Sequence, residues 1–315
     1  MLTDALLVLG GVALLYAGGE LLVRNASELA RSWGLSPLVI GLTIVAFGTS
    51  APELAASLTA SLRGSPEIAL GNVVGSNSAN IGLILGITAL LQPLRAQAAF
   101  LRREIPIMVG AAVLLVPMML GGTIGRAEGA VLVLLLVAFL WVLFRGDEAP
   151  QVEEEFRKEY AGRAAATAPW AALFGAAAGL ASLVAGAQAL VAGATSLARG
   201  FGVPELIIGL TLVAVGTSLP ELATSVIAAL KGEPDIALGN VVGSNVFNVL
   251  GILGVTAMVR PIAVPFASVG LDLGAMIGFS VLLVPLLITG QRLGRREGGF
   301  LLALYVSYVA YLYVR

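Results

Sequence analysis

The amino-acid sequence predicts an all-α polytopic membrane protein with ten transmembrane helices. We expect two five-helix repeats of inverted topology, with helices 2, 3, 7 and 8 broken. Three observations support this prediction: an apolar composition, ten apolar segments of membrane-spanning length, and an internal sequence repeat. Of the 315 residues, 58% are hydrophobic and only 12% are charged, and the mean hydropathy is +0.97. Soluble domains carry about 25% charged residues, so a soluble domain is excluded.

The apolar segments are each about 20 residues long, the length that a helix needs to cross the hydrocarbon core. They lie at 3–23, 37–62, 67–91, 104–121, 127–145, 169–191, 203–230, 235–259, 267–289 and 297–314. The first segment follows no basic leader and contains no cleavage site, so we interpret it as a retained span. One long polar stretch, 146–168, separates a first repeat at 1–145 from a second at 169–315.

The internal repeat has an offset of 168 residues. At that offset "GLTIVAFGTSAPELAAS" (41–57) aligns with "GLTLVAVGTSLPELATS" (209–225), and "ALGNVVGSN" occurs identically at 69–77 and 237–245. Each copy contains five predicted spans. An odd number of spans inserts the second copy upside down relative to the first, which is the plan of many secondary transporters.

Basic residues predict the orientation, because loops on the cytoplasmic side are enriched in Lys and Arg. Most of the 18 basic residues fall in the loops on the side of the 146–168 linker. We therefore expect a cytoplasmic linker, both termini outside, and a location in the inner or plasma membrane.

The residue types that are missing restrict the chemistry. The chain contains no Cys and no His, which excludes thiolate or imidazole metal sites, disulfides and His-based catalysis. The net charge of −1 and the absence of a basic cluster argue against a nucleic-acid partner. Oxygen ligands remain, and these are the ligands of hard cations.

The repeated motif "GTSAPE" places polar groups inside a predicted span. On a helix Thr49, Ser50 and Glu53 share one face. Pro52 lacks an amide hydrogen and leaves a backbone carbonyl one turn earlier without its partner. Such a broken helix is tolerated in a membrane only where it faces protein or water. The motif therefore predicts a bent helix that offers oxygen atoms to an ion.

The second motif continues the pattern. Asn72, Ser76 and Asn80 recur at a spacing of four, with Asn77 adjacent. Two interpretations of the motif asparagines Asn72, Asn77, Asn240 and Asn245 stay open: they coordinate an ion, or they hold the broken helices together. The matching polar residues of the second copy are Thr217, Ser218, Glu221, Asn240, Ser244, Asn245 and Asn248.

Two carboxylates, Glu53 and Glu221, are predicted at membrane depth with no basic side chain nearby. An unpaired charge there is costly, so a bound cation is the expected counter-charge. Two carboxylates neutralise one Ca²⁺, and hydroxyl, amide and carbonyl oxygens complete its six to eight ligands. The alternative is that both are structural buried carboxylates hydrogen-bonded to neighbouring hydroxyls. If the ion leaves, replacement charge is required, which favours obligatory exchange.

These motifs resemble the two alpha-repeats of the cation/calcium exchanger superfamily, in particular its prokaryotic sodium/calcium exchanger branch. The resemblance covers nearly the whole chain and implies that Ca²⁺ and Na⁺ share one site without a cofactor, with three Na⁺ exchanged per Ca²⁺. It also implies alternating access, in which the first and sixth spans slide over a core of the second, third, seventh and eighth. We expect one chain to be the functional unit. The implied ligands are Glu53, Glu221, Thr49, Ser50, Thr217, Ser218, Ser76, Ser244, Asn80, Asn248 and the backbone carbonyls of Ala46 and Ala214.

One departure affects the coupling ion. Members of this branch often have aspartate where this chain has Asn248, and relatives that exchange Ca²⁺ for protons also lack that aspartate. A Ca²⁺/H⁺ antiporter is therefore the nearest alternative to Ca²⁺/Na⁺ exchange. A cation channel and an intramembrane hydrolase are weaker alternatives, and without His no conventional catalytic triad can form. The prediction is a transporter and not an enzyme.

Overall fold

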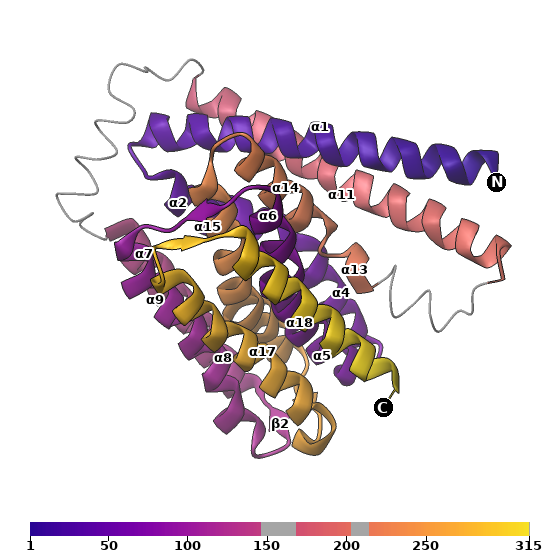
Figure 1. Cartoon of the computed structure of the whole chain (residues 1–315). Helices are drawn as coiled ribbons and strands as arrows, with labels where there is room; N and C mark the ends of the chain where they lie inside the picture. The colour runs from indigo at the N-terminus through magenta and orange to yellow at the C-terminus, as the bar shows by residue number, and fades with distance from the viewer. Residues whose placement is uncertain (146–167, 203–213, 315) are drawn as a thin grey trace.

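The structure is a computed structural model that describes residues 1–145, 168–202 and 214–314. The linker residues 146–167 and the first part of the predicted span 203–230 lie outside the described residues. Two long helices form a pair that lies across the remaining helices (Figure 1). They are α1 (Leu2–Trp33) and α11 (Pro169–Gly200), each of 32 residues. At 1.5 Å per residue each is about 48 Å long, more than the ~30 Å hydrocarbon core requires.

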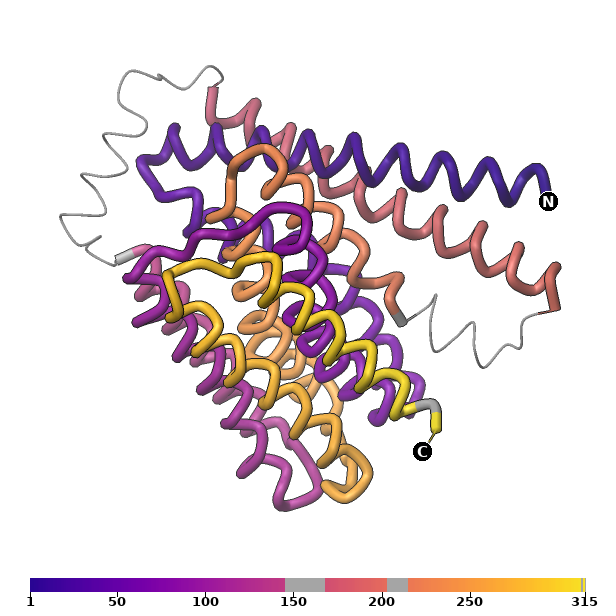
Figure 2. The backbone as a smooth tube through the Cα atoms, in the orientation of Figure 1, coloured from indigo at the N-terminus to yellow at the C-terminus, as the bar shows by residue number. Residues whose placement is uncertain are grey.

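Glycines bring the backbones of α1 and α11 together. A Cβ atom added at Gly18 would lie 2.8 Å from the Gly179 carbonyl oxygen, and one added at Gly186 would lie 2.9 Å from the Gly11 carbonyl oxygen. Because Gly11 meets Gly186 and Gly18 meets Gly179, the two helices run antiparallel, side by side (Figure 2). Small residues at such contacts permit close helix packing in membranes. These glycines face the partner helix, so α1 and α11 form one packed pair.

The motif-bearing segments form the centre of the bundle. The first copy contains α2 (Pro37–Ile40), η1 (Gly41–Val45), α3 (Ala46–Thr49), α4 (Ala51–Leu62), α5 (Pro66–Ala79), η2 (Asn80–Leu85) and α6 (Gly86–Leu91). The second contains α13 (Ala214–Gly216), α14 (Leu219–Leu230), α15 (Pro234–Val246), η4 (Phe247–Leu253) and α16 (Gly254–Val259). Helix α15 is the most enclosed, because every residue of 236–246 is buried. The π-helical segments η2 and η4 contain Asn80 and Asn248, and such widened turns are frequent at functional sites.

The remaining helices pack around this centre, and two short ribbons connect the copies. The helices are α7 (Ala98–Arg102), α8 (Glu104–Met119), α9 (Arg126–Arg145), α17 (Phe266–Ile288) and α18 (Arg295–Val314). Strand β1 (Leu94–Arg95) pairs antiparallel with β4 (Arg292–Leu293), and β2 (Thr123–Ile124) pairs antiparallel with β3 (Ile262–Ala263). The first strand of each copy therefore pairs with the second strand of the other copy, so each ribbon contains one strand from each copy.

The helix lengths confirm a helical membrane protein. Within the described residues, six helical stretches are long and apolar enough to cross a membrane: 2–33, 66–91, 126–144, 169–200, 234–259 and 266–288. A seventh span is added if the bent pair Pro37–Thr49 and Ala51–Leu62 is counted as one. The number of ten spans stays a prediction.

Candidate ion-binding site

The two GTS motifs break their helices at the serine. Helix α3 ends at Thr49, Ser50 leaves the helical conformation with φ −83° and ψ 3°, and α4 begins at Ala51. The two parts are bent by 43°. Ser218 has nearly the same backbone angles, φ −89° and ψ 6°. Pro52 lies in the first turn of α4, where its missing amide hydrogen is harmless. The expected kink is thus confirmed, but Thr49 and Glu53 lie on two helices and not on the face of one.

Each carboxylate is hydrogen-bonded by the motif of the other copy. The Ser218 hydroxyl donates to Glu53 Oε1 at 3.2 Å, and the Ser50 hydroxyl donates to Glu221 Oε1 at 3.1 Å. Thr217 likewise interacts with Glu53. Both carboxylates are buried, with 1% of each residue exposed. The crossed pairs bring the two GTS motifs together in the interior, which the sequence spacing alone does not reveal.

Asn72 on α5 and Asn240 on α15 hydrogen-bond to the broken helices that contain Glu53 and Glu221. Their own spans, 66–91 and 234–259, are continuous helical stretches, so the predicted breaks in helices 3 and 8 are wrong. The Asn72 amide donates to the Glu53 carbonyl at 3.1 Å and to Ser57 Oγ at 2.8 Å. In the second copy Asn240 donates equivalently to the Glu221 carbonyl at 3.3 Å and to a serine hydroxyl at 3.0 Å. Thr49 Oγ1 in turn donates to Asn240 Oδ1 at 3.0 Å. The NH₂ groups of these two asparagines therefore serve to hold helices together, one of the two interpretations left open by the sequence.

The remaining motif residues lie between α5 and α15. Asn80 donates to Asn245 Oδ1 at 2.9 Å, and Asn248 donates to Asn77 Oδ1 at 3.0 Å and to Ser76 Oγ at 3.2 Å. All five of these residues are buried. The structure thus brings the Asn80 and Asn248 of opposite copies into one hydrogen-bonded layer.

Several buried oxygen atoms in this region have no hydrogen-bond partner among the described residues. Burying such a group without a partner costs free energy, and a bound cation would offset that cost. These atoms are Glu53 Oε2, Glu221 Oε2, Asn80 Oδ1, Asn248 Oδ1 and Ser244 Oγ. All five belong to residues that the sequence analysis named.

The two predicted carbonyl ligands are placed less completely. The Ala46 carbonyl accepts the Ser50 amide at 3.0 Å and the Thr49 hydroxyl at 3.3 Å, so it lies beside the break. Ala214 is the first residue of α13, directly after the undescribed segment. Sequence reasoning missed one further contact, in which Asn245 Nδ2 donates to Met108 Sδ at 3.6 Å. The repeat held a signal for it, because methionine recurs at the repeat offset as Met276.

The chemistry of this cluster is that of a hard-cation site. Two carboxylates supply the charge, and amide and hydroxyl oxygens supply neutral ligands. Among the described residues, no third acidic, His or Cys side chain joins Glu53 and Glu221 in a metal-holding group. The charge of the cluster therefore matches one divalent cation, or monovalent cations in its place.

Comparisons with known proteins agree with this chemistry. The sequence profile of the sodium/calcium exchanger protein family matches residues 3–145 and 171–314. The chain is 40% identical to putative antiporter CaxA of Alkalimonas amylolytica and 36% identical to sodium/calcium exchanger MaX1 of Methanosarcina acetivorans, covering 98% of each chain in both cases. The inner membrane protein YrbG of Escherichia coli is 36% identical, covering 99% of this chain and 97% of YrbG.

The solved structures agree as well. The sodium-calcium exchanger NCX_Mj is 29% identical, with a TM-score of 0.83 and 98% of each chain covered. The resemblance stated from the motifs is thereby confirmed. The chain belongs to the sodium/calcium exchanger family of membrane antiporters, in the prokaryotic branch of the cation/calcium exchanger superfamily.

Proposed function

We propose that the protein exchanges Ca²⁺ for Na⁺ at the central oxygen cluster and expels Ca²⁺ from the cytoplasm. The observation that carries the proposal is the crossed pair of Ser–Glu hydrogen bonds, which brings two buried carboxylates together. One oxygen atom of each carboxylate has no hydrogen-bond partner among the described residues. The ion ligands are Glu53, Glu221, Thr49, Ser50, Thr217, Ser218, Ser76, Ser244, Asn80, Asn248 and the carbonyl oxygens of Ala46 and Ala214.

Charge balance explains why the cycle is an exchange. With both carboxylates ionised, the empty cluster carries two negative charges that the surrounding apolar protein solvates poorly. One Ca²⁺ neutralises the cluster, and three Na⁺ leave it with one net positive charge. Only loaded forms cross readily between the two access states, so Ca²⁺ leaves only when Na⁺ replaces it. Exchange of three Na⁺ for one Ca²⁺ therefore moves net charge.

The proposed framework consists of ten spans in two inverted repeats, 1–145 and 169–315, in the inner or plasma membrane. The 146–168 linker is cytoplasmic, both termini lie outside, and one chain is the functional unit. The reciprocal ribbons and crossed hydrogen bonds support two copies related by a two-fold axis. The inner-membrane relative supports the location.

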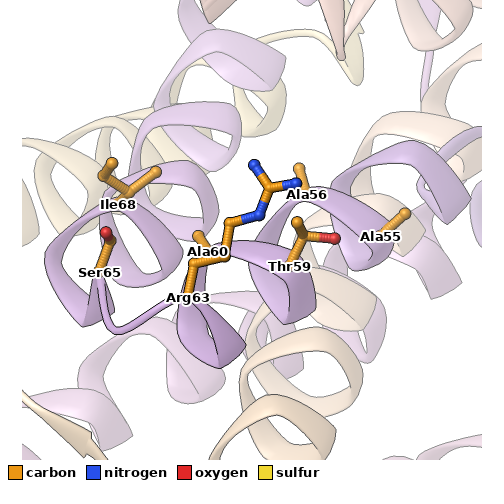
Figure 3. A pocket seen from close by; sticks show the side chains of 7 residues that line it. All are labelled: Ala55, Ala56, Thr59, Ala60, Arg63, Ser65 and Ile68. Atoms are coloured by element: carbon orange, nitrogen blue, oxygen red, sulfur yellow. The ribbon is translucent and has the colours of Figure 1, made fainter.

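Alternating access is supported by a difference between equivalent surfaces of the two copies. In the second copy α1 covers α14: Gly19 packs against Ile227, and Ile236 is fully buried. In the first copy the matching face of α4 borders an open pocket of about 530 Å³, shown in Figure 3. There Thr59, the counterpart of Ile227, is exposed, and Ile68, the counterpart of Ile236, is 64% exposed.

Most residues that line the pocket are small, which permits the close approach of a helix. Its lining residues are Ala55, Ala56, Thr59, Ala60, Arg63, Ser65 and Ile68. In the opposite access state, α11 docks here as α1 now docks on α14. The packed pair of α1 and α11 then moves as one unit over the motif-bearing helices.

The coupling ion is tested by the driving gradient. Calcium uptake into liposomes that contain the purified protein is expected when Na⁺ is loaded inside, and not when only a proton gradient is imposed. Uptake should also respond to membrane voltage, because net charge moves. Uptake driven by protons alone would establish Ca²⁺/H⁺ exchange instead. Flux without any ion on the opposite side would establish a channel.

Asn248 gives a second test of the coupling chemistry. Its NH₂ group donates to two oxygen atoms, Ser76 Oγ at 3.2 Å and Asn77 Oδ1 at 3.0 Å. In Asn248→Asp a carboxylate oxygen would face the Asn77 oxygen, a contact that is repulsive unless a proton lies between them. We expect exchange by this variant to acquire a pH dependence and an altered apparent Na⁺ affinity. Exchange measured from acidic to basic pH checks this; profiles identical to wild type would remove Asn248 from the site.

A further inference from the structure

Four asparagines of the central cluster form a reciprocal amide network. Asn77 Nδ2 donates to the Asn245 carbonyl at 3.2 Å, and Asn245 Nδ2 donates to the Asn77 carbonyl at 3.4 Å. The side-chain oxygens of the same two residues accept the amides of the other pair, Asn80 Nδ2 at 2.9 Å and Asn248 Nδ2 at 3.0 Å. All four are buried, with 1–2% of each residue exposed.

The network fixes which end of each amide faces the cluster. An asparagine side chain has a donor NH₂ group and an acceptor oxygen of nearly equal size, so only its partners determine its orientation. Here Asn77 and Asn245 hold the NH₂ groups of Asn248 and Asn80. The Oδ1 atoms of Asn80 and Asn248 are left without a hydrogen-bond partner in the described structure.

We propose that Asn77 and Asn245 are positioning residues that fix the amides of Asn248 and Asn80 with their oxygens toward the transported cation. This inference rests on the proposed function. If either amide turned over, it would present a partly positive NH₂ group to Ca²⁺ in place of a ligand oxygen. Asn77 and Asn245 therefore set the cation affinity of the site without contacting the ion.

A sulfur contact supports the assignment. The NH₂ group of Asn245 also donates to Met108 Sδ at 3.6 Å, and Met108 is buried. The repeat places Met276, fully buried, at the equivalent position of the second copy. A thioether is a weak, uncharged acceptor that competes poorly for a hard cation. Met108 accepts a hydrogen bond from the Asn245 amide without offering the cation a competing ligand. This contact helps Asn245 to hold Asn80 in place.

The test is a cycle of calcium affinities in the purified full-length protein, measured with Ca²⁺ as the only added ion. Asn245→Ala removes the acceptor of the Asn80 amide and should weaken Ca²⁺ binding by about 10–100-fold, the usual effect of losing an outer-shell partner. In an Asn80→Asp background the side chain presents an oxygen to the cation whichever way it turns, and its other oxygen repels Asn245 Oδ1 unless a proton lies between them. There Asn245→Ala should leave the Ca²⁺ affinity unchanged or raise it.

Asn72→Ala is the matched control, because among the described residues the Asn72 amide donates to Ser57 and a backbone carbonyl. Any effect that it has on Ca²⁺ affinity should be the same in both backgrounds. Asn77→Ala combined with Asn248→Asp repeats the cycle if Asn245→Ala does not fold. Equal losses from Asn245→Ala in both backgrounds would overturn the positioning role alone. Failure of the unmodified chain to bind Ca²⁺ would instead overturn the proposed function.

Discussion

Replacing Glu53 or Glu221 with alanine is expected to abolish calcium exchange. In the proposed site each residue supplies one of the two negative charges that neutralise Ca²⁺, and each is 1% exposed. Losing one carboxylate breaks a buried ion pair with the cation, which costs about 3–5 kcal/mol and corresponds to more than two powers of ten in ion affinity. The two variants should be equally defective, because the crossed serine hydrogen bonds place them equivalently. Sodium-driven uptake of radioactive calcium into liposomes measures the loss.

Glu104 is the matched control for this experiment. It is also 1% exposed, and it pairs with Arg103 at 2.6 Å at the start of α8. Glu104→Ala removes a buried carboxylate of the same chemistry outside the proposed ligand set. We expect it to lower the thermal stability while Ca²⁺ affinity is retained. Near-normal exchange by Glu53→Ala or Glu221→Ala would contradict the proposed ligand set, whatever the control shows.

The candidate residues were predictable from the sequence, but their pairing was not. The repeat identified Glu53 and Glu221, because polar groups that recur at one offset inside apolar segments have few structural explanations. Helical spacing, however, reports only neighbours on one helix. It grouped Ser50 with Glu53, whereas the structure pairs the Ser50 hydroxyl with Glu221. Contacts between copies depend on how the two halves pack, and no local pattern encodes that packing.

The fold shows the same division between local and long-range information. Apolar length predicted helices at 3–23 and 169–191, yet α1 and α11 extend about ten residues further, to Trp33 and Gly200. The apolar segment ends where polar residues begin, but the helix continues through those polar residues. The structure also uses Gly18 and Gly179 to join α1 to α11, a role that depends on a partner distant in sequence.

Cross-linking α1 to the start of α15 is expected to stop exchange reversibly. The Ser27 hydroxyl donates to Glu233 at 3.0 Å, just before α15. Glu20 forms an ion pair at 2.7 Å with Lys231, which follows α14. These two contacts join α1 to the C-terminal end of α14. If alternating access requires the α1 and α11 pair to move, a covalent link here traps one state. The chain contains no Cys, so Ser27→Cys with Glu233→Cys introduces the only thiols. A short cleavable thiol cross-linker should reduce exchange to background, and cleavage of the linker should restore it.

The internal repeat supplies the counterpart of this experiment. Thr195 and Ser65 are the repeat equivalents of Ser27 and Glu233, and Ser65 borders the pocket beside α4. In a Thr195→Cys/Ser65→Cys variant the two thiols should be cross-linked only after α11 has docked in that pocket. Ion conditions that slow the cross-linking of one cysteine pair should therefore speed the cross-linking of the other. Each cysteine alone, treated identically, controls for modification without linkage. Wild-type exchange rates in fully cross-linked Ser27→Cys/Glu233→Cys protein would show that these helices do not move. Because docking on α14 and docking on α4 use equivalent faces, opposite reactivity of the two pairs is the result that a rigid bundle cannot produce.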